Sequence, residues 1–189
     1  MRSPSSGAVT LKNVTAQIAA GGNVNAIVLA THASPGLQKL VQSCLSEIES
    51  GEIQEAFLDR LAHYDRSKDD RNLRAKLDGA GCPEAYYEFA IEAKEGFAKF
   101  YEIMCRHKSG QLILVSAFKH AYSVFREQVH PLLEQISFEQ QQEIFEQNVV
   151  KFLSDNLTGL PEFDGRMEAL GAIYFLADNC FIEYAKCSS

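Results

Sequence analysis

The residues whose types and spacing best fit a chemical role are Arg126, Glu127 and His130, in the run Arg126-Glu127-Gln128-Val129-His130. A Glu and a His with two residues between them share one helix face, and helical bundles hold paired metal ions with two such motifs plus two further carboxylates. Only one such motif is present, which is half of that site. Some helical ribonucleases place an Arg and a His on one helix with slightly wider spacing; here three residues intervene. The alternatives are a small helical RNase or metal-dependent enzyme that uses these residues, or a surface Glu and a His at a helix end.

The other common catalytic motifs are missing from the sequence. It contains neither of the glycine-rich loops that hold phosphates, Gly-x-x-x-x-Gly-Lys-[Ser/Thr] and Gly-x-Gly-x-x-Gly, and it lacks the Gly-x-Ser-x-Gly turn of many hydrolases. The five cysteines show no Cys-x-x-Cys pair and no zinc-site spacing. We therefore predict that the protein is not an enzyme and that it uses no cofactor and no metal.

Composition and charge exclude further classes of protein. A chain of 189 residues, 46% of them hydrophobic, is typical of one globular domain with or without an arm. A net charge of -7 without a basic patch argues against a nucleic-acid partner. No apolar run is long enough to span a bilayer, and no signal-peptide pattern opens the chain. Scattered cysteines are typical of a reducing compartment, so we expect a cytoplasmic protein that does not contact a membrane.

The elements that must position these residues fall into two units. In residues 1–34 only Arg2 and Lys12 are charged, and two strand-favouring stretches flank Gly21-Gly22-Asn23, which predicts a β-hairpin. An isolated hairpin is marginally stable in water. We therefore expect this N-terminal β arm either to pack on the rest of the protein or to pair with another chain through Val24 and Ile27. Pairing between two copies would make the protein a homo-oligomer.

Residues 35–189 show helical periodicity and form the second unit, a helical bundle domain. Ser34 and Pro35 predict the start of a helix that Gly51 ends. A second helix is expected over 52–64, with Ile53 and Phe57 turned inward, and a short one over 71–77.

Longer helices follow toward the C-terminus. The sequence predicts one from Pro83 to a break at Ser109-Gly110, one that bends at His130-Pro131, one that begins with a capping box of Ser137 and Gln140, and a last one over 167–181. Each carries an apolar stripe that the others must bury. The predicted fold is mainly α, a multi-helix bundle with an N-terminal β-hairpin or β arm.

The end of the last helix, residues 171–184, is apolar on nearly all sides and is interrupted only by Asp178-Asn179. Such a helix is normally buried, either at the centre of the bundle or against a partner. In the first case it is the central core helix. In the second case it buries one face and offers the rest to another protein. The residues predicted to bind a partner are then Tyr174, Asp178, Asn179, Phe181 and Tyr184, together with Val24 and Ile27 of the arm.

The same segment carries a family resemblance. Gly171-Ala172-Ile173-Tyr174-Phe175-Leu176-Ala177-Asp178-Asn179-Cys180-Phe181-Ile182 resembles the closing signature G-M-I-Y-F-L-T-G-N-C-H-I of C-terminal domains in bacterial ABC-three-component conflict systems. Ala177-Asp178 replaces Thr-Gly, and Phe181 replaces His. Further segments are similar to parts of these domains, namely 19–25, 71–77, 93–97, Phe125 and 129–131.

The resemblance implies a protein of antiphage or mobile-element conflict, in which an ABC-type ATPase, a small middle component and an effector-bearing component act together. Such domains usually follow a nuclease or other effector. Because residues 1–34 are too short for an enzyme, we expect a stand-alone version of the domain or a whole small protein. The leading hypothesis is a non-enzymatic protein-interaction module, an adaptor or scaffold, whose partner by resemblance is the ABC-type ATPase or the middle component.

Overall fold

The N-terminal helix has the ends that the sequence predicts. The structure is a computed structural model that describes residues 34–54, 56–65 and 72–185. Helix α1 spans Pro35–Ser50: the Ser34 side chain accepts a hydrogen bond from the Leu37 amide, and Gly51 ends the helix in the left-handed conformation. The predicted β arm, with Val24 and Ile27, lies outside the described residues. Within the described residues no strand is present.

The predicted helix over 52–64 is wrong in most of its length. Of the residues in this range that the structure describes, only Asp59–Ala62 are helical, as α2, and Ile53 and Phe57 are exposed rather than buried. The reason is a competing set of hydrogen bonds from distant residues. The Gln111 side chain accepts from the Leu58 amide at 2.8 Å and donates to the Ala56 carbonyl at 3.2 Å, and the Gln54 amide donates to the Arg106 carbonyl at 2.8 Å. These bonds fix the backbone of residues 52–54 and 56–58 in a non-helical path.

Three helices follow with the expected order. Helix α3 spans Leu73–Gly79, α4 spans Glu84–Cys105 and α5 spans Lys108–Val124. The break between α4 and α5 lies at Arg106 and His107, and the predicted break at Ser109-Gly110 is wrong because both residues belong to α5. Gly110 is needed for the sharp reversal of the chain, since a Cβ there would lie 2.3 Å from the Met104 carbonyl oxygen.

The next helices depart locally from α geometry. After α5 the chain continues as the π-helix η1, Phe125–Val129, and the 3-10 helix η2, His130–Leu132, at the proline where a bend is predicted. Ser137 and Gln140 form the predicted capping box ahead of α6, Phe138–Phe145. A second π-helix, η3, Glu146–Val150, joins α6 to α7, Lys151–Leu157.

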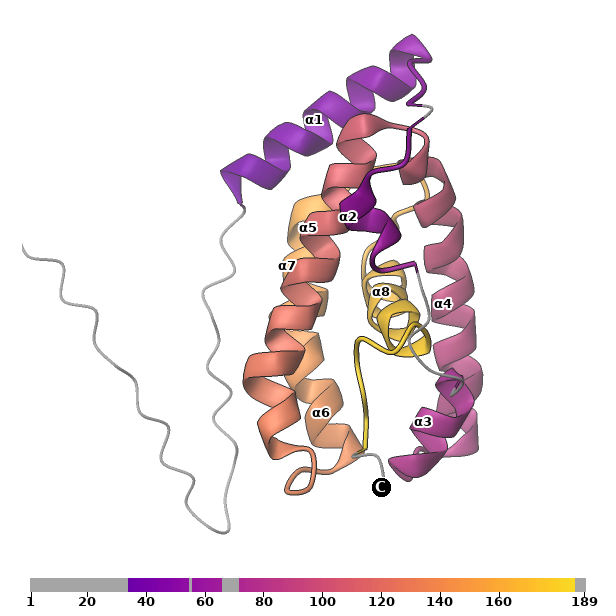
Figure 1. Ribbon diagram of the computed structural model, residues 1–189, viewed down its shortest axis with the longest axis vertical. Coiled ribbons are helices and arrows are strands. Elements are labelled where there is room, and N and C mark those ends of the chain that lie inside the picture. Colours follow the sequence, from indigo (N-terminus) through magenta and orange to yellow (C-terminus); the bar gives the residue numbers. More distant parts are fainter. Residues whose placement is uncertain (1–33, 55, 66–71, 186–189) are drawn as a thin grey trace, which may run out of the picture.

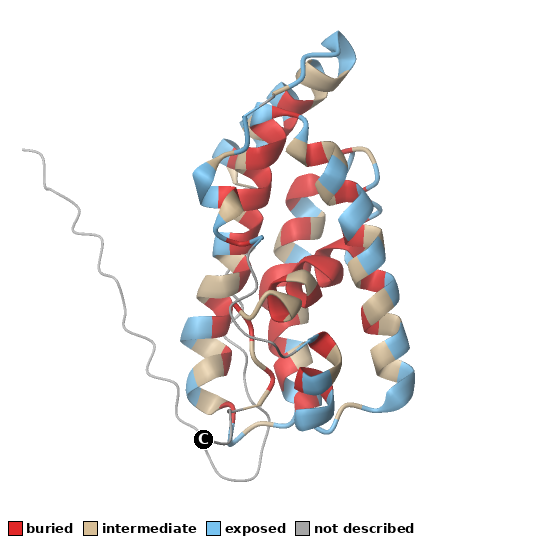
Figure 2. Ribbon diagram, turned by 45° about the vertical axis from the view of Figure 1, so that its right-hand side comes forward, coloured by how far each residue is buried: buried red, intermediate tan, exposed pale blue. Residues whose placement is uncertain are grey.

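The last helix, α8, spans Arg166–Asp178 and lies at the centre of the bundle. Figure 1 shows it nearly end-on between α4 on one side and α5 to α7 on the other, so it crosses α4 steeply. Figure 2 shows that it is buried almost throughout its length.

The predicted helical bundle is confirmed. The predicted extension of the last helix to residue 181 is wrong, because Asn179 caps α8 and Phe181 lies beyond it. None of the described helices combines the length and apolar character that crossing a membrane requires.

Candidate functional site

Three of the segments that carry the family resemblance, 72–77, 93–97 and 171–182, meet where α8 crosses α4 beside α3. The two helix backbones touch at Gly171, where a Cβ would lie 2.1 Å from the Ala93 carbonyl oxygen and 2.5 Å from the Phe97 Cβ. Only glycine allows so close an approach. Gly171 therefore sets the position of α8 on α4.

Beyond this crossing, Asp178 connects the end of α8 to two other helices. One carboxylate oxygen accepts a hydrogen bond from the Leu73 amide at the start of α3, at 2.9 Å. The other forms an ion pair with the Lys94 ammonium of α4 at 2.7 Å. The single carboxylate thus fixes the relative positions of α3, α4 and α8.

Lys76 of α3 makes a further contact with the same end of α8. Its ammonium donates to the Ala177 carbonyl and to the Cys180 sulfur, which is 2.9 Å away. Lys76 is only 3% exposed, so its charge is placed against the carbonyl end of α8, where a helix favours a cation. We refer to Lys76, Lys94, Asp178 and Cys180 as the Asp178 cluster.

The charges in this cluster determine the protonation state of Asp178. Burial alone would raise the pKa of this carboxyl, but the hydrogen bonds from Lys94 and the Leu73 amide, with the charges of Lys94 and Lys76, outweigh burial and lower its pKa below the ordinary value. Asp178 is therefore ionised at neutral pH. Its polar contacts are made within the chain and position helices.

Tyr174 lies inside the bundle rather than on its surface. The residue is fully buried, and its hydroxyl donates to the Tyr86 hydroxyl at 2.8 Å. The Tyr86 hydroxyl donates in turn to the Gln142 side-chain oxygen at 2.9 Å. Burial raises the pKa of the Tyr174 phenol, which stays protonated. Tyr174 thus joins α8 to α4 and α6 by hydrogen bonds.

Phe181 and Tyr184 are also buried, at 3% and 1% exposure. The Phe181 ring lies 4.9 Å from the Tyr64 ring, and the Tyr184 ring lies 5.5 Å from the Phe138 ring, measured between centroids. As folded, these two rings and Tyr174 cannot form an exposed docking surface, so the partner-binding role predicted for them is corrected to one in the core. The interpretation of residues 171–184 as part of the core therefore holds for Tyr174 within α8 and for Phe181 and Tyr184 beyond it. Asn179 is half-buried at the end of α8.

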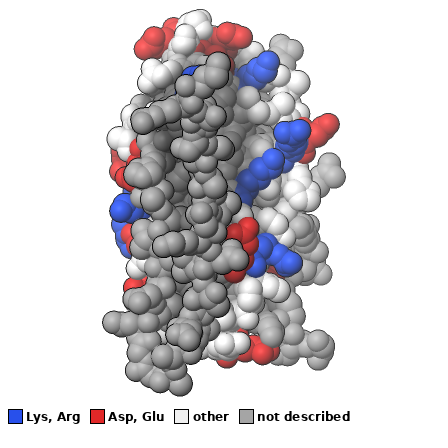
Figure 3. Space-filling model, turned by 90° about the vertical axis from the view of Figure 1, so that its left-hand side faces the viewer, with Lys and Arg blue, Asp and Glu red and all other residues white. Residues whose placement is uncertain are grey.

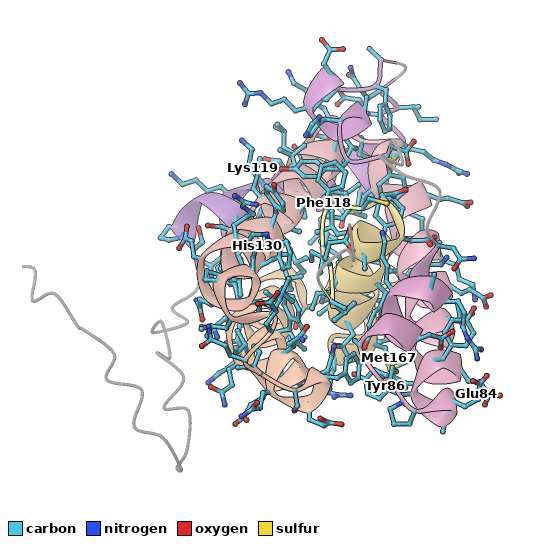
Figure 4. All side chains as sticks on the ribbon, turned by 60° about the horizontal axis from the view of Figure 1, so that its bottom comes forward. Glu84, Tyr86, Phe118, Lys119, His130 and Met167 are labelled. Atoms are coloured by element: carbon cyan, nitrogen blue, oxygen red, sulfur yellow. The ribbon has the colours of Figure 1, made fainter. Side chains whose placement is uncertain are left out.

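Arg126, Glu127 and His130 lie in a different part of the bundle. Arg126 and Glu127 are exposed on η1, Glu127 accepts a hydrogen bond from the Ser123 hydroxyl at 2.7 Å, and the His130 ring packs edge-on against Phe125 with centroids 5.5 Å apart. Figure 4 shows His130 well away from Tyr86 and Met167. Among the residues that the structure describes, no group of three His, Cys, Asp or Glu side chains lies close enough together to hold a metal ion.

A pocket of about 260 Å³ lies on the other side of the α4–α8 crossing from Asp178. We refer to it as the Gly96 pocket. Its walls come from the exposed side of α4 and the first turn of α8, and its lining residues are Glu92, Glu95, Gly96, Lys99, Met167 and Glu168. Figure 4 shows Met167 where the start of α8 meets α4.

Sequence reasoning missed the roles of Lys76, Lys94 and Glu168. A signal for the two lysines was present, because an Asp in an otherwise apolar helix must find cationic or hydrogen-bonding partners when it is buried. Glu168 gave no such signal, because it lies in the first turn of α8, where acidic residues are common since they interact favourably with the positive end of the helix dipole.

On the face shown in Figure 3, the visible Lys and Arg side chains are interspersed with Asp and Glu and form no single basic block.

Comparison with protein-family models gives a match over more than half of the chain. Residues 72–184 match the family model for C-terminal domain 9 of the ABC-three component (ABC-3C) systems. The matched range begins at Asn72, which caps α3, and it contains the whole Asp178 cluster and the Gly96 pocket. Neither a curated protein nor a solved structure matches the chain.

Proposed function

The chain belongs to the family of C-terminal domain 9 of the ABC-three component systems, and from this premise we propose that it is a non-enzymatic protein-interaction module, an adaptor. The family match, over more than half of the chain, is the observation that carries the proposal, because a system of several components requires contacts between them. It also confirms the resemblance seen in the terminal segment of the sequence. The ABC-three component systems act in biological conflict, including antiphage defence, and this is the setting in which we place the protein.

The geometry of the family residues supports this proposal. The terminal segment with its signature is held inside the fold by Gly171, the Asp178 cluster and the hydrogen bonds of Tyr174. These contacts fix the bundle as one body, and a body of fixed shape presents its outer side chains at defined positions. The partner we propose is the ABC-type ATPase or the small middle component of the same system.

Co-expression tests this function directly. The full chain, tagged, is produced together with an ABC-type ATPase and a middle component of an ABC-three component system from the same source, and the complex is isolated by affinity and size-exclusion chromatography. We expect one of these components to elute with the chain, and an unrelated helical protein with the same tag to elute alone. Failure of every component to bind at micromolar concentration would contradict the adaptor function.

A direct assay separates the adaptor from the enzyme alternative. The purified chain is incubated with RNA, and its metal content is measured. RNA cleavage that disappears in His130→Ala, or a bound metal that disappears in Glu127→Gln, would replace the adaptor by an enzyme. Self-association through residues 1–34 stays a prediction; light scattering on the full chain and on a chain that lacks residues 1–33, and so keeps the Ser34 cap, tests it.

A further inference from the structure

We propose that the Gly96 pocket binds an arginine side chain of a partner polypeptide. This inference rests on the proposed function, because it names the chemistry by which one partner is recognised. It starts from the space in the pocket. At about 260 Å³ the pocket is smaller than the cavities that hold drug-sized ligands. It suits a single side chain.

Gly96 gives the first reason to regard this space as used. It lies in the middle of α4, where glycine destabilises a helix relative to alanine. Packing does not require a glycine here: a Cβ would meet only the Glu168 side-chain oxygen, at 3.5 Å, which is an ordinary contact. What the missing side chain does provide is open space directly in front of Glu168.

Glu168 gives the second reason. The residue is only 8% exposed, and one of its carboxylate oxygens accepts a hydrogen bond from the Asp164 amide at 3.0 Å. The other oxygen, Oε1, is the atom that faces Gly96. A carboxylate so largely removed from water gains more from a cationic donor than an exposed one does. The floor of the pocket therefore offers a hydrogen-bond acceptor of negative charge.

The rim of the pocket determines the sign of the ligand's charge. Glu92 and Glu95 are exposed on α4 and, with Glu168, bring three carboxylates to the lining against one cation, Lys99. These carboxylates are too far apart to hold a metal ion between them. An extended organic cation can reach the floor and the rim together.

Arginine fits this arrangement better than lysine. Its planar guanidinium carries five N–H donors and can contact the floor carboxylate and a rim carboxylate at once, whereas an ammonium is a compact point charge. The aliphatic stem of an arginine can lie along Met167, the apolar wall of the pocket. Among the described residues that line the pocket, Lys99 is the one cation, so it competes with the ligand.

Methyl NMR on the full chain tests this assignment. The chain has three methionines, Met1, Met104 and Met167; Met104 is fully buried and serves as an internal control, while Met167 lines the pocket. With ¹³C-methyl methionine, we expect N-acetyl-arginine amide to shift the Met167 signal in a saturable way and to leave Met104 unchanged. The uncharged isostere N-acetyl-citrulline amide should produce no shift, and N-acetyl-lysine amide should bind more weakly.

Three variants complete the test. Glu168→Gln keeps the acceptor for Asp164 and removes the charge, and we expect it to weaken arginine binding by about tenfold or more, which is about 1.4 kcal/mol. Gly96→Ala narrows the pocket on an intact helix and should also weaken binding. Lys99→Gln removes the competing cation and should strengthen it.

Several results would overturn the assignment: an equal response to citrulline amide or lysine amide, no response of Met167, or arginine binding unchanged in both Glu168→Gln and Gly96→Ala. These results are distinct from failure of the proposed function. If the chain binds N-acetyl-arginine amide but no component of its system, the assignment of the pocket stands and the adaptor role is contradicted. If the Glu168→Gln variant binds the partner component as tightly as the wild type does, the adaptor role stands, but the pocket is not the contact.

Discussion

Gly171 and Gly96 lie on the two helices that cross at the centre of this molecule, and they have opposite surroundings. At Gly171 the backbone of α8 is so close to α4 that a Cβ would lie 2.1 Å from the Ala93 carbonyl oxygen. At Gly96, on α4, the nearest atom to a Cβ is a side-chain oxygen 3.5 Å away, and the space in front is an open pocket. The first glycine brings two helices into contact, and the second leaves room.

The difference shows that a glycine inside a helix has two physical explanations. Where backbone meets backbone, the missing side chain is a packing requirement, and the fold depends on it. Where the added side chain would have space, the glycine costs helix stability without improving the packing, so the space itself needs an explanation. The same substitution at the two sites therefore separates the region that holds the fold from the region that we assign to binding.

The largest effect is expected for Gly171→Ala. The added methyl overlaps the Ala93 carbonyl and the Phe97 side chain, and relief requires α8 to move away from α4. Overpacking of this kind typically costs 1–3 kcal/mol, and a clash with backbone belongs at the upper end, so we expect a loss of about 3 kcal/mol in the free energy of unfolding. Urea denaturation followed by circular dichroism measures it. A loss below about 1 kcal/mol would show that the two helices are less closely held than the contact at Gly171 indicates.

A smaller loss of stability is expected for Asp178→Asn. This substitution removes the ion pair between α8 and α4 and so tests how much charge contributes to holding the two helices together. Asn keeps an acceptor for the Leu73 amide and removes the ion pair with Lys94. Because the Asp178 side chain is 32% exposed, solvent weakens the pair, and we expect a loss of about 1 kcal/mol at pH 7. Asp155→Asn, on an exposed part of α7, is the control and should have little effect.

The pH dependence of this loss has a definite sign. The pKa of Asp178 is lowered in the folded chain, so the carboxylate stabilises the fold above the unfolded pKa of about 3.9. That stabilisation disappears as the pH falls through the lowered pKa of the folded chain. The difference between the wild type and Asp178→Asn should therefore be constant near neutral pH and shrink below about pH 4. A difference that grows in acid would contradict the ion pair.

The sequence predicts much of the fold because several helix ends depend on local residues. Ser34 and Gly51 bound α1, and Ser137 with Gln140 begins α6, and each of these signals acts over a few residues. The stretch formed by residues 52–54 and 56–58 could not be predicted in this way. Its conformation is determined by Gln111, more than fifty residues away, which takes the backbone groups that a helix would have paired internally.

The site was less predictable than the fold, for a related reason. Periodicity shows that α8 is apolar on nearly all sides. It does not distinguish burial in its own bundle from burial against a partner, so the sequence also allows a partner-binding role for Tyr174. The structure distinguishes the two, because the Tyr174 hydroxyl is buried and donates a hydrogen bond to the Tyr86 hydroxyl of α4. Gly96 and Gly171 likewise look alike in the sequence, because each is a glycine within a predicted helix.

The smallest effect, and the only one of opposite sign, is expected for Gly96→Ala. Alanine restricts the unfolded chain and favours the helix, and its Cβ meets Glu168 only at an ordinary contact distance, so we expect a gain of about 0.5 kcal/mol in the free energy of unfolding. Urea denaturation beside Gly171→Ala gives the matched comparison. A gain in stability with a loss of arginine binding would show that the glycine keeps the pocket open at the expense of helix stability. A loss of stability near that of Gly171→Ala would mean that Gly96, too, is a packing glycine, and the argument from its open surroundings would fail.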